Sequence, residues 1–195
     1  MTNQKTNKMA LLIIDMQYDF LAEGAPVFCI GGLEMIPRVK QLAEACRKKN
    51  IPVIYTREVH RQNGMDMGRE LDGNEPDHCL NGGKGAEIHQ DLTPVQGDYI
   101  VNKVRYDAFL ETDLVFLLNG LGIFPGDTLI ICGVASNVCV HYTSAGAHQR
   151  DYKIKVVEDC CAGSCLEEHE AAMRQVNYLQ HGSRIKQKEA LELIG

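Results

Sequence analysis

The sequence predicts an α/β fold, in which a single domain forms a three-layer sandwich with a mostly parallel sheet flanked by helices. Two observations predict it. Short apolar runs bounded by Gly, Asp or Pro recur along the chain, as is typical of strands that are covered on both faces. Segments with helical apolar spacing separate these runs. The length of 195 residues and the hydrophobic fraction of 45% are adequate for one core.

The apolar runs give the expected strands. They span residues 10–14, 52–56, 99–101, 128–131 and 153–157, with 184–185 as a weaker sixth candidate. Helices are expected over residues 33–49, 112–118, 137–150 and 166–179, the second with a Thr112 cap. Alternation of strands and helices predicts right-handed crossovers between parallel strands. Residues 57–97 break the rhythm and are rich in Gly, Asp, Asn and His, so we expect a lid or binding loop there.

Composition excludes several classes of function. The net charge of -6 and the lack of a Lys/Arg run argue against a nucleic-acid partner. No apolar run approaches the ~20 residues that span a bilayer. The polar start predicts a flexible arm over residues 1–8, a domain over residues 9–195, and a cytoplasmic protein without a signal peptide. The eight cysteines contain no C-x-x-C pair, so most should be buried and inert.

Three chemically distinct side chains follow strands of the predicted sheet. Asp15 comes directly after the first strand, Lys103 lies just past the third, and Cys139 starts a helix after the fourth. Each residue alone has an ordinary interpretation, as a turn former, a surface lysine or a core cysteine. Ligands of open parallel sheets bind beyond the carboxyl ends of the strands, where all three would meet. Their convergence predicts an active site with a cysteine nucleophile.

The chemistry of this trio is coherent. A helix N-terminus and a nearby lysine both favour the thiolate, so we expect the pKa of Cys139 to be lowered. Asp15 can take the thiol proton and return it to the leaving group. Backbone N–H groups in the turn before the helix can stabilise an oxyanion.

Three segments carry a resemblance to a known family. Residues 11–20 (LLIIDMQYDF), 103–109 (KVRYDAF) and 133–140 (GVASNVCV) resemble the three motifs of the isochorismatase-like cysteine hydrolases. The resemblance implies a six-stranded parallel sheet, a catalytic triad and a homodimer or homotetramer. It also implies a cis peptide between Val134 and Ala135 and an oxyanion hole formed by the N–H groups of Ala135 and Cys139. The triad implied is the trio derived above.

Substrate-binding residues are also expected. Phe20 and Tyr106 match positions that line the pocket of the family, and Val134 lies beside the expected oxyanion hole. A guanidinium suits a carboxylate or a urea-type carbonyl. Arg105 is the best such candidate because it lies two residues from Lys103. The other arginines near the expected mouth of the site are Arg57, Arg61 and Arg69.

The resemblance implies a small-molecule hydrolase. Since Cys139 is present, we expect cleavage of a C–N amide bond in a carbamoyl or ureido compound through a thioester, with the specific substrate open. One alternative is a nicotinamidase-like enzyme with a metal at Glu58, His60 and His78. Glu58 stands where that group has Asp, the chain has no Trp, and Glu58 can pair instead with an arginine, so we expect no metal. The other alternative is a catalytically silent binding protein.

Overall fold

The sheet has six strands, and every pair of neighbours is parallel. The computed structural model describes residues 8–73 and 75–195. The strand order is β3-β2-β1-β4-β5-β6. The strands are β1 (Met9–Ile14), β2 (Val53–Glu58), β3 (Tyr99–Lys103), β4 (Thr128–Gly133), β5 (Lys153–Cys161) and β6 (Arg184–Ile185). The predicted fold class and the six-stranded sheet are confirmed.

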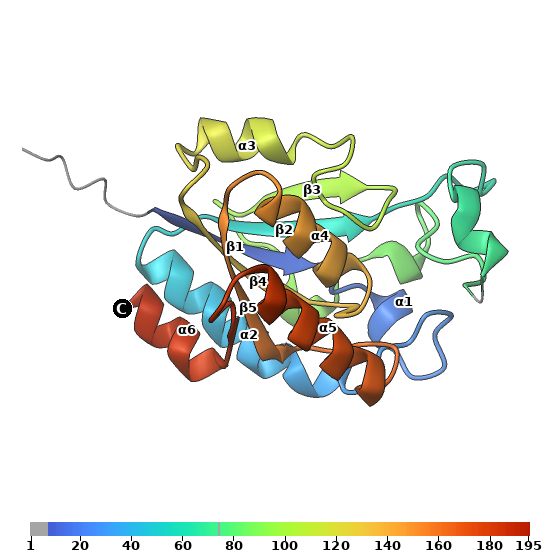
Figure 1. Ribbon diagram of the computed structural model, residues 1–195. Helices are drawn as coiled ribbons and strands as arrows, with labels where there is room; N and C mark the ends of the chain where they lie inside the picture. Colours follow the sequence, from blue (N-terminus) through green and yellow to red (C-terminus); the bar gives the residue numbers. More distant parts are fainter. Residues whose placement is uncertain (1–7, 74) are drawn as a thin grey trace, which may run out of the picture.

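Helices cover both faces of this sheet (Figure 1). They are α1 (Tyr18–Leu21), α2 (Gly32–Lys48), α3 (Leu114–Gly120), α4 (Cys139–His148), α5 (Leu166–Leu179) and α6 (Gln187–Ile194). Helices α2 and α6 pack against each other and against β5, whereas α4 packs on β4, β5 and α5. Neither α1 nor α6 was predicted from the sequence. Thr112 accepts from the N–H of Leu114, and the cap position itself is Asp113.

Two strands continue beyond their apolar runs. The ladder between β2 and β3 pairs Arg57 with Asn102 and Glu58 with Lys103. The apolar pattern did not mark these residues because they are polar, although Glu58 and Lys103 are 1% and 2% exposed. The extension places Glu58 and Lys103 as the last residues of neighbouring strands, at the carboxyl edge of the sheet.

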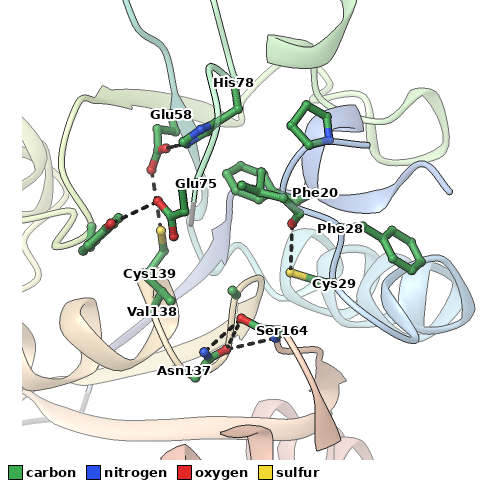
Figure 2. Close-up of a pocket in the computed structure, with 14 residues that line it drawn as sticks. Phe20, Phe28, Cys29, Glu58, Glu75, His78, Asn137, Val138, Cys139 and Ser164 are labelled. Atoms are coloured by element: carbon green, nitrogen blue, oxygen red, sulfur yellow. Dashed lines mark hydrogen bonds and ion pairs between the residues drawn. The ribbon is translucent and has the colours of Figure 1, made fainter. Parts of the chain in front are cut away.

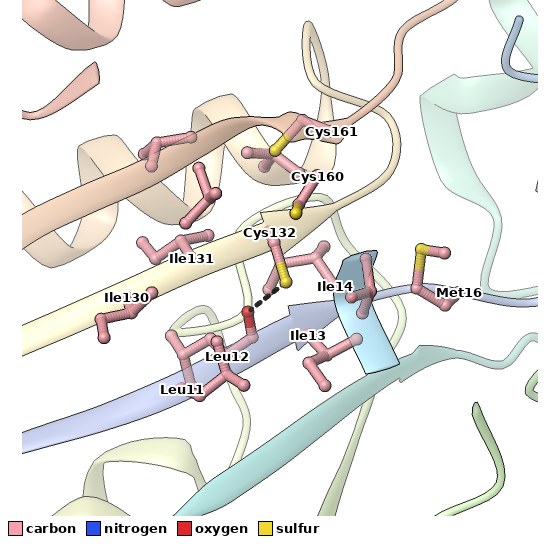
Figure 3. Packing of buried hydrophobic residues seen from close by; sticks show 14 of the residues in the cluster. Leu11, Leu12, Ile13, Ile14, Met16, Ile130, Ile131, Cys132, Cys160 and Cys161 are labelled. Carbon is pink, nitrogen blue, oxygen red and sulfur yellow. Dashed lines mark hydrogen bonds between the residues drawn. The ribbon is translucent and has the colours of Figure 1, made fainter. Parts of the chain in front are cut away.

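The core is formed by the central strands and the helices on either side. β1 is buried from Ala10 to Ile14, and Figure 3 shows its side chains packed with those of β4 and the end of β5. All eight cysteines are free thiols, and all but Cys165 are buried. Cys132, Cys160 and Cys161 lie in this cluster and act as small apolar side chains.

The long segment after β2 is folded rather than loose. It contains three 3₁₀ turns, η1 (Gly68–Asp72), η2 (Lys84–Ala86) and η3 (Gln90–Leu92). His60 exchanges backbone hydrogen bonds with Cys79 and Asn81, which closes the first half of the segment. Gln17 then ties it to the sheet, since its side chain bonds the backbone of Glu58 and Ala86.

The start of the fold lies one residue earlier than expected. The Lys8 N–H donates to Asp127, and its carbonyl accepts from Thr128, so Lys8 is joined to β4. The remainder of the predicted arm, residues 1–7, lies outside the described residues. In the part of the chain that is described, no helix is long and apolar enough to cross a bilayer.

Candidate active site

The three predicted catalytic residues meet at the carboxyl edge of the sheet. Asp15 directly follows β1, Lys103 ends β3, and Cys139 begins α4. Lys103 Nζ lies 2.7 Å from Asp15 Oδ2 and 3.4 Å from Cys139 Sγ. All three residues are buried, with Cys139 2% exposed. The tertiary structure therefore brings together the trio that the fold rule placed at this edge.

A fourth ionisable group belongs to the same cluster. Glu58, at the end of β2, lies on the strand between those that carry Asp15 and Lys103. Its Oε2 is 2.7 Å from Lys103 Nζ and 3.6 Å from Cys139 Sγ. From the sequence, Glu58 was expected only as a metal ligand or an arginine partner. The arginines have other partners: Arg57 bonds Asn102, Arg61 lies near Asp66, and Arg69 pairs with Asp72.

The pKa of the Cys139 thiol is raised, whereas the sequence led us to expect a lowered value. Burial raises its pKa well above the ordinary value, Lys103 opposes the shift, and Asp15 and Glu58 add to it. The helix N-terminus and the cation are both present, but burial of the thiol, with a smaller contribution from the two carboxylates, outweighs them. The resting nucleophile is therefore a protonated thiol that needs a base.

Asp15 has the properties of that base. Burial raises the pKa of Asp15, although the Lys103 ammonium lowers it. Oδ1 accepts a hydrogen bond from Thr56 at 2.7 Å, which fixes the carboxylate plane. A ligand oxygen of Asp15, one of Glu58 and Sγ of Cys139 all lie within 4.8 Å of one another. Burial alone would lower the pKa of Lys103, but its anionic neighbours, Asp15 first, raise it, so the lysine stays charged.

The turn between β4 and α4 supplies backbone donors. The Val134–Ala135 peptide is cis, as the resemblance implied. The Ala135 carbonyl accepts from the N–H groups of Val138 and Val140. The Ala135 and Cys139 N–H groups have no acceptor among the described residues. Both therefore stay candidates for the oxyanion hole.

A second buried cluster adjoins Glu58. His78 Nε2 lies 2.8 Å from Glu58 Oε1, and His60 Nε2 lies 3.4 Å from both Glu58 Oε1 and Glu70 Oε2. One ligand atom from each of these four residues lies within 4.8 Å of the others. Among the described residues, neither oxygen of the buried Glu70 carboxylate has a hydrogen-bond partner, nor does His60 Nδ1. Glu70 was missed because nothing in its local sequence distinguishes it from a surface glutamate.

Similarity to known proteins agrees with this geometry. A family model described as "Isochorismatase domain" matches residues 9–187. This chain belongs to the isochorismatase family.

Several family members are similar over most of the chain. A probable inactive nicotinamidase of Arabidopsis thaliana is 31% identical, covering 86% of this chain and 87% of its own. An N-carbamoylsarcosine amidase of an Arthrobacter species is 30% identical, covering 75% of this chain and 56% of its own. The crystal structure of an isochorismatase-like hydrolase from Alkaliphilus metalliredigens has 31% identity and a TM-score of 0.86, covering 96% and 100%. A pyrazinamidase of Pyrococcus horikoshii in complex with zinc has 28% identity and a TM-score of 0.80, covering 92% and 98%.

In this isochorismatase-family chain, a pocket of about 450 Å³ opens onto Cys139 (Figure 2). Phe20 and Tyr106 line it, as the sequence analysis expected. The other lining residues are Pro26, Val27, Phe28, Cys29, Glu58, Glu75, His78, Ala135, Asn137, Val138, Cys139 and Ser164. Those between Pro26 and Cys29 were missed because they follow α1 in an irregular segment without a chemical signature.

Two expected substrate-binding residues lie elsewhere. The Val134 side chain is fully buried and is not part of the pocket lining. Arg105 donates to the backbone carbonyls of Asp66 and Val104, and its guanidinium lies against Gly68. Arg105 therefore holds the η1 region, and its position beside Lys103 in the sequence does not bring it to the pocket, because its guanidinium is bound to these carbonyls.

Proposed function

We propose that this protein is an amidase that cleaves a C–N bond of a small carbamoyl or ureido compound through a thioester on Cys139. The observation that carries the proposal is the position of Cys139 Sγ, which faces the pocket 3.4 Å from Lys103 Nζ with Asp15 in the same buried cluster. The similarity to N-carbamoylsarcosine amidase supports the substrate class.

The steps of the proposed reaction follow from the protonation states of Cys139 and Asp15. Asp15 takes the thiol proton as sulfur attacks the substrate carbonyl, and the N–H groups of Ala135 and Cys139 stabilise the oxyanion. Asp15 then gives its proton to the leaving nitrogen as the C–N bond breaks, leaving the thioester. A water molecule loses a proton to Asp15, attacks the thioester, and releases the acid as the thiol is protonated again. Lys103 stays charged throughout and offsets the negative charge of the carboxylates.

A panel of small amides tests this function. Ammonia release is measured together with the intact mass of the protein after rapid acid quenching. We expect turnover with at least one ureido or carboxamide compound and a mass increase that maps to Cys139. Cys139→Ala should show neither signal. Absence of both signals with the wild-type protein across the panel would favour the silent binding protein instead.

A specific observation favours a second candidate, a metal-assisted amidase of the nicotinamidase type. Glu70 supplies a buried carboxylate that has no hydrogen-bond partner in the described part of the chain, and two imidazoles and a second carboxylate surround the same point. This donor set fits a divalent ion such as zinc, iron or manganese, held by Glu58, His60, Glu70 and His78. When bound, the ion would supply a Lewis-acidic position in the pocket wall, since Glu58 and His78 line the pocket. The zinc complex of the similar pyrazinamidase supports this candidate.

A further inference from the structure

The polar lining of the pocket includes two carboxylates, and the imidazole of His78, which also lines it, pairs with Glu58. Glu58 and Glu75 both line it, and no Lys or Arg belongs to that lining among the described residues. Lys103 lies beneath the pocket, where its side chain is fully buried and paired with Asp15 and Glu58. The ammonium group beside the nucleophile is therefore already shared by two carboxylates.

The arginines of this region do not reach the pocket. In the described structure, Arg57, Arg61 and Arg69 have side-chain partners, which are Asn102, Asp66 and Asp72 respectively. Arg105 donates to the backbone carbonyls of Asp66 and Val104. A substrate carboxylate would thus meet no guanidinium in the pocket, and its burial near carboxylates would be unfavourable.

Glu75 offers an acceptor to the pocket. The Tyr106 hydroxyl donates to Glu75 Oε2 at 3.1 Å, which fixes the carboxylate. The other oxygen, Oε1, has no hydrogen bond among the described residues, and Glu75 is partly exposed to the pocket. Figure 2 draws Glu75 among the residues that line the pocket, together with Glu58 and Cys139. An ionised carboxylate accepts hydrogen bonds only, so it favours N–H groups and cations.

We propose that Glu75, fixed by Tyr106, selects amides whose distal end carries N–H donors or a positive charge, and that the pocket rejects amides with a carboxylate at that end. This inference rests on the amidase function proposed above and narrows its substrate class. Within the carbamoyl and ureido compounds, it favours neutral or cationic members over carbamoyl amino acids.

Three primary amides of similar length test the selection: butyramide, 4-aminobutyramide and succinamate. They differ mainly in the charge at the end away from the amide. Ammonia release is measured at pH 8, because burial raises the pKa of Glu75 and higher pH favours its charged form. We expect kcat/KM for 4-aminobutyramide to exceed that for succinamate at least tenfold, with butyramide between them. A value for succinamate equal to or above that for 4-aminobutyramide would overturn the proposal.

Variants assign the selection to Glu75. Glu75→Gln should reduce the cation-to-anion ratio of kcat/KM about tenfold, and Tyr106→Phe should reduce it less, because it loosens Glu75 without removing its charge. Glu87→Gln is the matched control, because Glu87 is exposed and pairs with Lys84 outside the pocket. The cation-to-anion ratio of kcat/KM in this variant should equal that of the wild type. An unchanged ratio in Glu75→Gln contradicts the proposal.

Affinity measurements distinguish a failure of this proposal from a failure of the amidase function. The three compounds are also titrated into Cys139→Ala, with affinities taken from ligand-observed NMR. If the wild-type protein hydrolyses none of them but the affinities follow the same charge order, the amidase function fails and the selection by Glu75 stands. If hydrolysis occurs and neither kcat/KM nor affinity depends on charge, the amidase function stands and the selection fails.

Discussion

Glu58 Oε2 lies 2.7 Å from Lys103 Nζ, the same distance that separates this nitrogen from Asp15 Oδ2. The lysine is therefore held between two carboxylates while it also lies 3.4 Å from Cys139 Sγ. Because its charge is shared, Lys103 offsets only part of the burial and the negative charge around the thiol. This arrangement explains why the cysteine rests as a thiol, and the proposed reaction therefore gives Asp15 the role of base.

Alkylation of Cys139 should depend on pH in the alkaline range. Burial raises the pKa of this thiol, so its thiolate fraction should keep rising above pH 8 rather than level off at neutral pH. The measurement uses iodoacetamide and peptide mass spectrometry on Cys165→Ser, because Cys165 is the cysteine most open to solvent. Cys29 and Cys161 serve as internal controls and should react more slowly, since they lack a neighbouring cation. A Cys139 rate that is flat between pH 6 and pH 8 contradicts the assigned shift.

Replacing Lys103 by Met should affect both the thiol and the fold. Removal of the cation raises the pKa of Cys139 further, so labelling should require a still higher pH than in the wild type. Two buried carboxylates also lose their partner, which should lower the free energy of unfolding by about 3–5 kcal/mol. Urea denaturation measures the second effect. Lys188→Met, an exposed lysine on α6, should change neither quantity. Overlapping labelling profiles would show that Lys103 does not act on the nucleophile.

Asp15→Asn should leave the protein folded but slow acylation. The amide can still accept from Thr56, yet it cannot take the thiol proton. The loss should be about 10²–10⁴-fold, the usual contribution of a general base. Single-turnover formation of the acyl-enzyme measures it. Asp113→Asn, at the start of α3 and outside the pocket lining, is the control. Acylation within threefold of the wild-type rate would remove Asp15 from the role of base.

The four-ligand cluster predicts that the metal-free protein takes up a divalent ion. Zn²⁺ or Mn²⁺ at 100 times Kd should stabilise the fold by about 2.7 kcal/mol, visible as a rise in Tm. Glu70→Gln should reduce this rise because it removes a buried ligand, whereas Asp72→Asn, exposed at the end of η1, should retain it. No rise in the wild type, with under one equivalent of metal by elemental analysis, would support the sequence-based expectation of an enzyme without metal.

Gly133 should not tolerate a side chain. Its φ of +120° is unfavourable for other residues, and a Cβ there would lie 2.1 Å from the carbonyl oxygen of Ile14. Both strands are central, so neither backbone can move away. Gly133→Ala should lower the free energy of unfolding by more than about 3 kcal/mol, combining a strained conformation with overpacking. At Gly120, which ends α3, a Cβ meets nothing within 4 Å, and the same substitution should change stability by less than about 1 kcal/mol.

The sequence by itself determined the fold class and the three chemical groups of the proposed triad. Apolar periodicity is a local property, so it predicted the strands around Ile14 and Ile130 and the helices that alternate with them. The rule for parallel sheets then brought Asp15, Lys103 and Cys139 to one edge, and the distances of 2.7 and 3.4 Å around Lys103 agree with this.

Only the tertiary structure decided the electrostatics and the shape of the site. Glu58 became a partner of Lys103 because β2 continues past its apolar run, which depends on pairing with β3. Glu70 and Glu75 reach their positions through the fold of a long segment without periodicity, and Arg105 is directed away from the pocket by the carbonyls of that segment. The direction of the Cys139 pKa shift likewise depends on burial and on the sum of charges from three strands, which no local pattern contains.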